Sequence, residues 1–208
     1  GKAVVESLIA HEDEVIALDD TPNHLVSTWA TNAEVNLMTP PDKHEWPNLL
    51  RSFTEIVVSP GIPNCHPVFD AAAQVGIELL DESDVAARWD QRPRCAITGT
   101  NGKTSVVSLT VEMLKNSGRN AVSAGNTEIP LVKAINDQKA EVFVVEASSF
   151  RLGHARFFDA KPAAWLNFSP DHLDHHGSLE AYRLAKARIW DSIVEPDDAI
   201  ANFADPVV

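Results

Sequence analysis

Apolar positions along this chain follow two spacings, and the two spacings alternate. Short apolar runs such as 55–58 and 141–146 are typical of buried strands. Apolar residues three and four positions apart, at 1–10, 66–75 and 106–114, are typical of one face of a helix. Strands that alternate with helices in this way predict an α/β fold with parallel sheets.

The same pattern predicts the order of the elements. Strands are expected at 14–18, 34–38, 55–58, 76–80, 95–97, 120–123, 141–146, 163–167 and 198–202. Helices are expected at 1–10, after residue 22, at 66–75, after residue 103, at 129–135 and at 179–193. The polar stretch 88–94 contains Pro93 and separates a predicted domain at 1–90 from a second at 91–208.

Composition narrows the class of protein. Of the 208 residues, 44% are hydrophobic, which is enough for a core, but no apolar run is long enough to span a bilayer. The absence of a signal-peptide pattern and the wide separation of Cys65 and Cys95 predict a reduced, cytoplasmic location without membrane insertion. The net charge of −13 argues against a general nucleic-acid binder, although it leaves room for a nucleotide ligand.

A glycine-rich turn joins the strand at 95–97 to the helix that follows it. Its sequence, Thr-Gly-Thr-Asn-Gly-Lys-Thr-Ser at 98–105, is typical of a phosphate-binding loop. Backbone N–H groups at the start of the helix attract an anion, Lys103 can reach terminal phosphates, and the Thr104 hydroxyl can bind Mg²⁺. Ile97 stands where the general pattern has its first glycine, so the loop is a short version. The alternative is a chance Gly/Asn turn.

Two further polar groups follow strands and are expected at the same edge of the sheet. Glu146 ends a strongly apolar strand, so it is either a Mg²⁺ ligand together with Thr104 or a solvated carboxylate. The Asp171–His176 segment admits three interpretations. It is a transition-metal site, the source of one histidine for a Mg²⁺ site beside phosphates, or a surface loop without a role.

Other positions are ambiguous from the residues alone. Asp19 follows a strand, where an acidic residue often meets a ribose, but a plain Asp/Pro turn is the favoured interpretation. Ser59, Pro60 and Gly61 follow a buried strand at a place where open α/β sheets bind ligands. Lys186 lies in a helix whose spacing predicts only a solvated face.

Taken together, these motifs resemble the ATP-dependent Mur ligases of bacterial cell-wall synthesis. The resemblance rests on 98–104, on Glu-Ala-Ser-Ser-Phe at 146–150, and on 59–61, 125–126, 171–174 and 181–186. Within that family, 146–150 is similar to the members that add D-glutamate. The resemblance implies an incomplete N-terminal Rossmann-like parallel sheet followed by part of a P-loop ATPase-type α/β domain.

The resemblance also implies roles for individual residues. ATP would be bound by Gly99, Thr100, Asn101, Gly102, Lys103, Thr104 and Ser105. Mg²⁺ would be bound by Thr104, Glu146, His172 and an N-carbamoylated Lys186. The catalytic residues would be Lys103, His172 and Lys186. UDP-N-acetylmuramoyl-L-alanine would contact Asp19, Ser59, Pro60, Gly61, Asn126, Ser148 and His172, although Asp20 and Thr21 depart from the basic residue that the family often has near the uracil.

The implied reaction joins D-glutamate to the alanine carboxylate through an acyl phosphate, in a monomeric enzyme. Gly1 resembles the last glycine of the family's N-terminal turn, and the chain ends inside the central domain. We therefore expect a fragment that is inactive alone. Two other functions compete with the ligase: a P-loop small-molecule kinase and a non-catalytic nucleotide-binding module.

Overall fold

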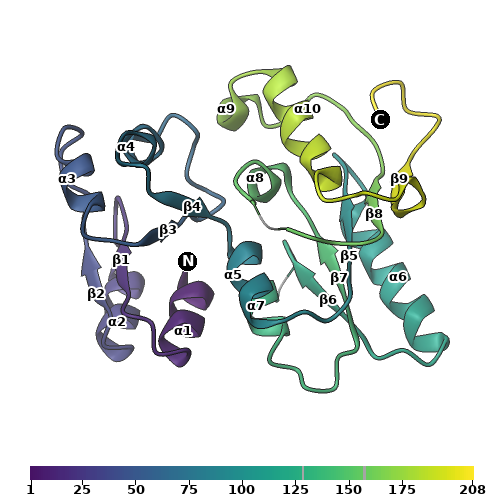
Figure 1. Cartoon of the computed structure of the whole chain (residues 1–208), viewed down its shortest axis with the longest axis horizontal. Coiled ribbons are helices and arrows are strands. Elements are labelled where there is room, and N and C mark those ends of the chain that lie inside the picture. Colours follow the sequence, from purple (N-terminus) through teal and green to yellow (C-terminus); the bar gives the residue numbers. More distant parts are fainter. Residues whose placement is uncertain (128, 157) are drawn as a thin grey trace. The chain divides into compact units, whose positions relative to one another are not determined.

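The computed structural model of this chain describes residues 1–127, 129–156 and 158–208 (Figure 1). Contacts divide it into two compact units. The first comprises 1–57 and 65–79, and the second comprises 58–64 and 80–208. This division falls about ten residues before the boundary expected at 90 and 91, which stays a prediction.

The first unit is built from short strands and helices in alternation. Its elements are α1 (Lys2–Ala10), β1 (Ile16–Leu18), α2 (His24–Asn32), β2 (Asn36–Met38), α3 (Trp46–Leu50), β3 (Glu55–Val57), α4 (Pro67–Val75) and the start of β4 (Glu78–Leu80). β1 and β2 pair in parallel, with Ile16 opposite Asn36, and β3 pairs with β4. The predicted strands and helices of this region are confirmed, apart from α3, which was not predicted.

The second unit is organised around a five-stranded parallel sheet. Its strands are β5 (Arg94–Thr98), β6 (Ala121–Gly125), β7 (Val142–Glu146), β8 (Ala163–Trp165) and β9 (Ala199–Ala201), in the order β6-β7-β5-β8-β9. Ile97 of β5 lies opposite Glu146 of β7 and Ala164 of β8. The loops that follow these three strands therefore emerge side by side, where the strand order reverses. This confirms the predicted α/β class.

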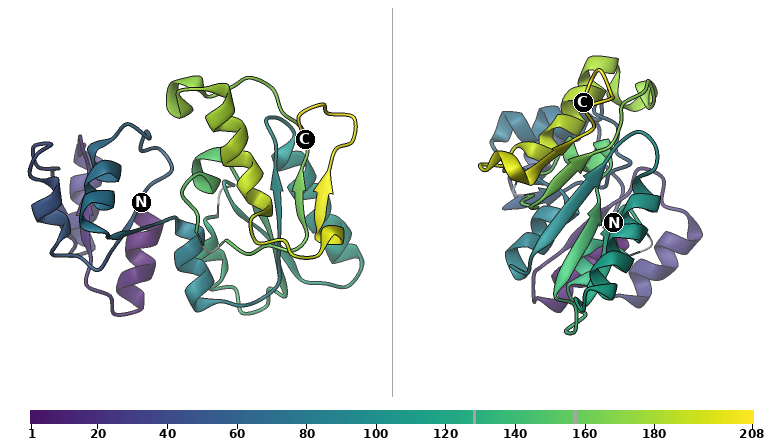
Figure 2. Two further views of the ribbon diagram at one scale, coloured as in Figure 1. Left: turned by 45° about the horizontal axis from the view of Figure 1, so that its top comes forward. Right: turned by 90° about the vertical axis from the view of Figure 1, so that its right-hand side faces the viewer.

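Helices cover both faces of this sheet, and successive residues of β5 point to opposite faces. Ile97 packs on α6 (Lys103–Asn116) in a cluster with Val107 and Val111. Ala96 packs in a second cluster with Leu152 and Ile189. In the right-hand view of Figure 2 the sheet lies between α6 and α10 (Leu179–Ala187). Burial on both faces explains why the central strands β5 and β7 appear in the sequence as continuous apolar runs.

Several shorter elements complete the unit. They are α5 (Glu82–Trp89), α7 (Leu131–Ala134), α8 (Ser149–Leu152), α9 (Leu173–His176) and 3₁₀ turns at Arg188–Trp190 and Pro196–Asp198. The prediction of one helix over 179–193 was wrong, because α10 ends at Ala187. The Arg188 guanidinium donates to the Gly153 and Ala155 carbonyl oxygens, and Trp190 Nε1 donates to the Ala163 carbonyl oxygen, which favours the tighter turn. Within the described residues, no helix has the length and apolar character needed to cross a membrane.

Candidate functional site

The turn between β5 and α6 is held against the sheet by close backbone approach. Thr98 Oγ1 donates to the Ala147 carbonyl oxygen over 2.8 Å and thereby joins the ends of β5 and β7. A Cβ atom on Gly99 would lie 3.1 Å from Leu166 Cβ, so a larger residue would press on the loop after β8. Gly102 precedes α6 with a φ of +80°, a conformation that favours glycine. The fourteen-residue α6 therefore begins directly at the turn.

Asn167 holds the middle of this turn in place. Its Oδ1 accepts from the Asn101 backbone N–H at 2.9 Å, and its Nδ2 donates to the Asn101 carbonyl oxygen at 3.0 Å. The Thr100 N–H also donates to the Asn167 carbonyl oxygen at 3.1 Å. Sequence reasoning did not select Asn167, although its place as the first polar residue after an apolar strand was a usable signal.

Thr104, Glu146 and Asn126 form one connected group. Thr104 Oγ1 donates to Glu146 Oε2 over 2.8 Å, and Asn126 Nδ2 donates to Glu146 Oε1 over 3.3 Å. Glu146 is 4% exposed, so the interpretation of a solvated carboxylate was wrong. The three side chains come from α6, β7 and the loop after β6, as the strand order requires.

The donors of this group are a hydroxyl, a carboxylate and an amide, which suit a hard cation. Mg²⁺ in nucleotide sites usually takes one or two protein oxygens and completes its shell with phosphate and water. Across the part of the chain that the structure describes, no three His, Cys, Asp or Glu side chains are grouped as metal ligands. The oxygens of Thr104, Glu146 and Asn126 are of the kind that Mg²⁺ takes, and a Mg²⁺ site here stays a prediction.

Two lysines converge on one backbone atom of the turn. Lys103 Nζ donates to the Gly99 carbonyl oxygen at 2.9 Å and to that of Thr100 at 3.0 Å. Lys186 Nζ donates to the same Gly99 oxygen at 2.8 Å. Lys186 is 2% exposed, so the solvated face expected from spacing was wrong. Burial and then the charge of Lys103 lower the pKa of Lys186, Asp171 opposes both, and the net result is a pKa of about 7.

His172 lies in the loop after β8, directly before α9. It precedes the helix with a φ of +52°, and its backbone N–H donates to Asp171 Oδ1 at 2.8 Å. Its ring packs on Phe150 at 4.7 Å and on Tyr182 at 5.8 Å between centroids. Tyr182 is on α10 with Lys186, and its hydroxyl lies 3.1 Å from Thr100 Oγ1. The structure thus connects His172 to the turn through Tyr182, and its role as a metal ligand stays a prediction.

The remaining predicted residues have structural contacts of their own. Ser148 directly precedes α8, and its Oγ caps the helix by accepting from the Arg151 N–H at 3.4 Å. The Ser59 carbonyl oxygen accepts from the Ile62 N–H at 3.0 Å in the short segment of the second unit that contains Pro60 and Gly61. In the first unit, Asp19 Oδ1 accepts from the Thr21 N–H at 2.9 Å, as in an Asp/Pro turn. A substrate role for each of these residues stays a prediction.

Comparison with known proteins places this arrangement in a family. The Mur ligase middle domain matches residues 97–208. The UDP-N-acetylmuramoylalanine–D-glutamate ligase of Desulfatibacillum aliphaticivorans is 41% identical over 163 residues, which are 76% of this chain and 36% of that protein. The ligase of the same name from Thermus thermophilus is 38% identical over 164 residues, which are 79% of this chain and 39% of that protein. The chain therefore spans little more than a third of the length of these curated relatives.

Solved structures agree on the fold. The UDP-N-acetylmuramate:L-alanyl-γ-D-glutamyl-meso-diaminopimelate ligase of Neisseria meningitidis superposes with a TM-score of 0.57 at 15% identity, over 99% of this chain and 68% of that one. A murein peptide ligase of Psychrobacter arcticus superposes with a TM-score of 0.51 at 16% identity, over 99% and 47%. The domain match extends over more than half of the residues and includes the turn, Glu146 and Lys186. The chain belongs to the Mur ligase family.

Proposed function

We propose that this chain is the nucleotide-binding part of an ATP-dependent ligase that adds D-glutamate to UDP-N-acetylmuramoyl-L-alanine. One observation carries the proposal. The phosphate-loop residues, the Thr104–Glu146 pair and Lys186 meet at the ends of β5 and β7. Relatives at about 40% identity over most of this chain are named as D-glutamate ligases.

The turn at 99–105 binds the phosphates of ATP in this proposal. The backbone N–H groups at the start of α6 face the anion, and the helix dipole adds to the attraction. Lys103 now caps the carbonyl oxygens of Gly99 and Thr100. An arriving phosphate offers Lys103 a charged acceptor, which makes a stronger hydrogen bond than a carbonyl oxygen. Ser105 is the third residue of α6. Its N–H belongs to the first turn, has no acceptor within the helix, and can donate to a phosphate oxygen.

Thr104 and Glu146 hold Mg²⁺, with His172 and Lys186 as further ligands. When bound, Mg²⁺ supplies positive charge against the phosphate oxygens. In the structure the Thr104 hydroxyl and the Asn126 amide fix the orientation of both Glu146 oxygens. Glu146 is therefore preorganised by neutral groups, which leaves its charge available.

Lys186 is N-carbamoylated in this proposal. An ammonium group on Lys186 repels that of Lys103, because both side chains donate to the Gly99 carbonyl oxygen. Addition of CO₂ to the neutral amine, with loss of one proton, replaces the cation by a carbamate anion. A carbamate oxygen is a ligand that Mg²⁺ prefers, and its charge complements that of Lys103.

In this proposal UDP-N-acetylmuramoyl-L-alanine binds at the same edge of the sheet as ATP. Asn126, Ser148 and His172 lie on the loops after β6, β7 and β8, next to the nucleotide. Ser59, Pro60, Gly61 and Asp19 contact the UDP-sugar end, as the family pattern indicates. The alanine carboxylate attacks the γ-phosphorus of ATP and releases ADP, and the D-glutamate amine then displaces phosphate from the acyl phosphate. The products are one amide bond, ADP and phosphate, formed by a monomer in the cytoplasm.

The test follows phosphate release by the gene product that carries these 208 residues. We expect release only when ATP, UDP-N-acetylmuramoyl-L-alanine and D-glutamate are all present, and none from Lys103→Ala. L-glutamate in place of D-glutamate is the matched control. Phosphate transfer to a hydroxyl without D-glutamate would favour a kinase. Nucleotide binding without turnover under all conditions would favour a non-catalytic binding module.

A further inference from the structure

A pocket lies at the end of β5 opposite to the phosphate-binding turn. It has a volume of about 540 Å³ and is lined by residues of α5, the start of β5, and the segment before β8. Arg94 is the first residue of β5 and Thr98 the last, which places the two ends roughly 13 Å apart at about 3.3 Å per residue. A ligand in this pocket therefore does not belong to the nucleotide site.

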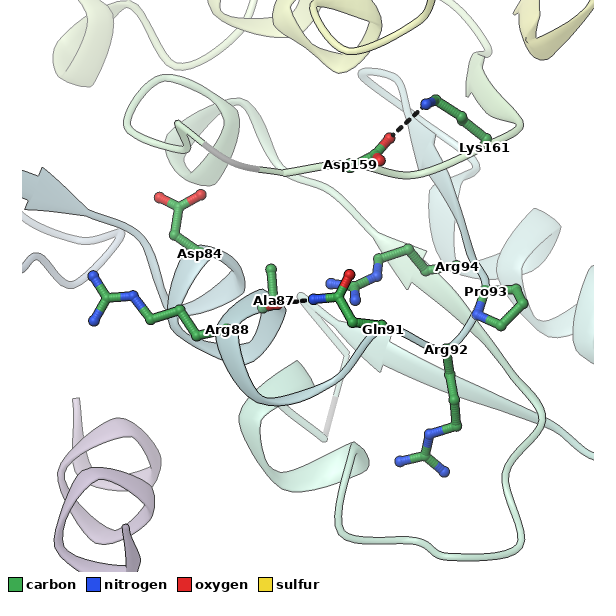
Figure 3. A pocket seen from close by; sticks show the side chains of 9 residues that line it. All are labelled: Asp84, Ala87, Arg88, Gln91, Arg92, Pro93, Arg94, Asp159 and Lys161. Atoms are coloured by element: carbon green, nitrogen blue, oxygen red, sulfur yellow. Dashed lines mark hydrogen bonds and ion pairs between the residues drawn. The ribbon is translucent and has the colours of Figure 1, made fainter. Parts of the chain in front are cut away.

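The charge of the pocket lining is predominantly positive. Arg88, Arg92, Arg94 and Lys161 line it, against two carboxylates, Asp84 and Asp159. The Arg92 guanidinium is engaged outside the pocket, where it donates to the carbonyl oxygens of residues 135, 137 and 140. Figure 3 shows it pointing away from Arg94 and Gln91. The other positive charges of the lining are those of Arg94, Lys161 and the exposed Arg88.

Arg94 carries an unsatisfied donor at this pocket. Only 6% of the residue is exposed, and Nη2 donates to the Asp90 carbonyl oxygen. Nη1 is buried and has no acceptor among the residues that the structure describes. A guanidinium stays protonated, and a buried N–H without an acceptor is unfavourable. An oxyanion supplies the missing acceptor and, with two oxygens, matches the fork of the guanidinium.

Asp90 and Asp159 stabilise the charged form of Arg94, but neither accepts a hydrogen bond from its Nη1. Asp84 accepts from the backbone N–H groups of Asp81 and Arg156 at 2.8 and 3.0 Å, which neutralise part of its charge. Asp159 is paired with Lys161 at 3.3 Å, and their side chains are 61% and 41% exposed. Figure 3 shows this pair across the pocket from Arg94 and Gln91. Lys161 can therefore turn from Asp159 to a ligand at little cost.

We propose that this pocket binds a small organic anion through a phosphate or carboxylate group held by Arg94 and Lys161. Its volume lies within the range of small-molecule sites and exceeds that of one oxyanion, so the ligand has further atoms beyond the charged group. The inference is independent of the ligase reaction, because it uses none of the residues at the phosphate-binding turn.

The test is an NMR titration of the ¹⁵N-labelled 208-residue chain. Sodium phosphate and sodium citrate are added separately, with sodium chloride at equal ionic strength as the control. We expect saturable shifts of the amides at 87–92, 94 and 159–161 that sodium chloride does not reproduce. Binding at the phosphate loop is read separately from the amides at 99–104. The tighter of the two probes identifies the preferred charged group.

Three variants make the result decisive. Asp159→Asn removes the competing partner of Lys161, so it should tighten binding by about two- to fivefold, whereas Lys161→Ala should weaken it by a similar factor. Arg94→Lys should abolish the saturable shifts. If this variant does not fold, the opposite effects of Asp159→Asn and Lys161→Ala on the affinity still test the proposal. Lys115→Ala, an exposed lysine on α6, is the control. An adventitious ion only would give shifts that match sodium chloride or that ignore all three variants, and this result would overturn the proposal.

Discussion

Lys103 and Lys186 donate to the same acceptor, the Gly99 carbonyl oxygen, from helices far apart in the chain. Two cationic groups on one backbone oxygen repel each other. Burial, together with this proximity, accounts for a Lys186 pKa of about 7. The relationship places two lysine side chains on one carbonyl oxygen of the turn, and the lowered pKa leaves a large share of Lys186 uncharged at neutral pH.

Replacing Lys103 by methionine tests this relationship directly. The pKa of Lys186 should rise from about 7 because a neighbouring positive charge is lost, but it should stay below 10.5 because burial is the larger cause. The measurement is an NMR pH titration of ¹³Cε-labelled lysine. Lys115→Met should leave the pKa of Lys186 unchanged. An equal Lys186 pKa in Lys103→Met and the wild type would disprove the coupling.

Replacing Glu146 by glutamine tests the Mg²⁺ site. The amide keeps the shape of the side chain but loses its charge, so the gain in ATP affinity that Mg²⁺ provides should fall by about tenfold or more. Calorimetric titrations with ATP in the presence of Mg²⁺ or EDTA give both affinities. Glu141→Gln, immediately before the other end of β7, should keep the full effect of Mg²⁺. If Glu146→Gln also keeps it, Glu146 is not a ligand.

Replacing Gly125 by alanine tests how closely the loop after β6 approaches β7. The added Cβ atom would lie 2.4 Å from the Glu146 carbonyl oxygen, and Gly125 has a φ of +99°. We expect the free energy of unfolding to fall by about 3 kcal/mol or more. Gly118→Ala has a similar φ of +86° but open space around the new atom, so it should cost about 1 kcal/mol. Equal losses in urea unfolding would contradict the close approach.

Acid should destabilise the second unit through His176. Burial, and then the positive charges around it, lower the pKa of His176 from 6.5 to about 4. The unfolded chain therefore binds this proton more readily, and the stability contributed by the neutral ring is lost as the pH falls from 6.5 to 4. The loss should be on the order of 1 to 3 kcal/mol once solvent screening of the charged ring is included.

The same urea unfolding measurements at pH 4 to 7 check this effect. His176→Gln should show a flatter dependence on pH than the wild type over this window, whatever its stability at pH 7. His24→Gln, at an exposed histidine of the first unit, should keep the wild-type slope. An unchanged slope in His176→Gln would assign the acid sensitivity to other groups.

Much of the second unit could be predicted from the sequence because its central strands, β5 and β7, are buried on both faces. Such strands appear as uninterrupted apolar runs, and the polar residue after each run marks the edge where the loops meet. Glu146 was found in this way. Lys186 was not found from spacing, because a lysine on a helix is usually solvated and its acceptor, Gly99, is remote in sequence.

The helix α5 shows what the sequence could not reveal. Its residues Glu82 and Asp84 are 3% and 0% exposed, although acidic residues in a row indicate a solvated segment. Their partners are remote: Glu82 Oε1 accepts from the Val132 N–H at 2.6 Å, Glu82 also pairs with Arg151, and Asp84 accepts from the Arg156 N–H. Only the folded chain brings these groups together, so neither periodicity nor composition could identify the helix.

The most direct test of the account is a calorimetric titration of this 208-residue chain with ATP in the presence of Mg²⁺. We predict saturable binding that weakens by about 10- to 100-fold in Lys103→Met, because a charge-assisted hydrogen bond to phosphate is lost. Lys115→Met, on the same helix, should bind like the wild type. A folded wild-type chain that does not bind ATP, or a Lys103→Met variant that binds it equally well, would contradict the assignment of the turn after β5 to the phosphates.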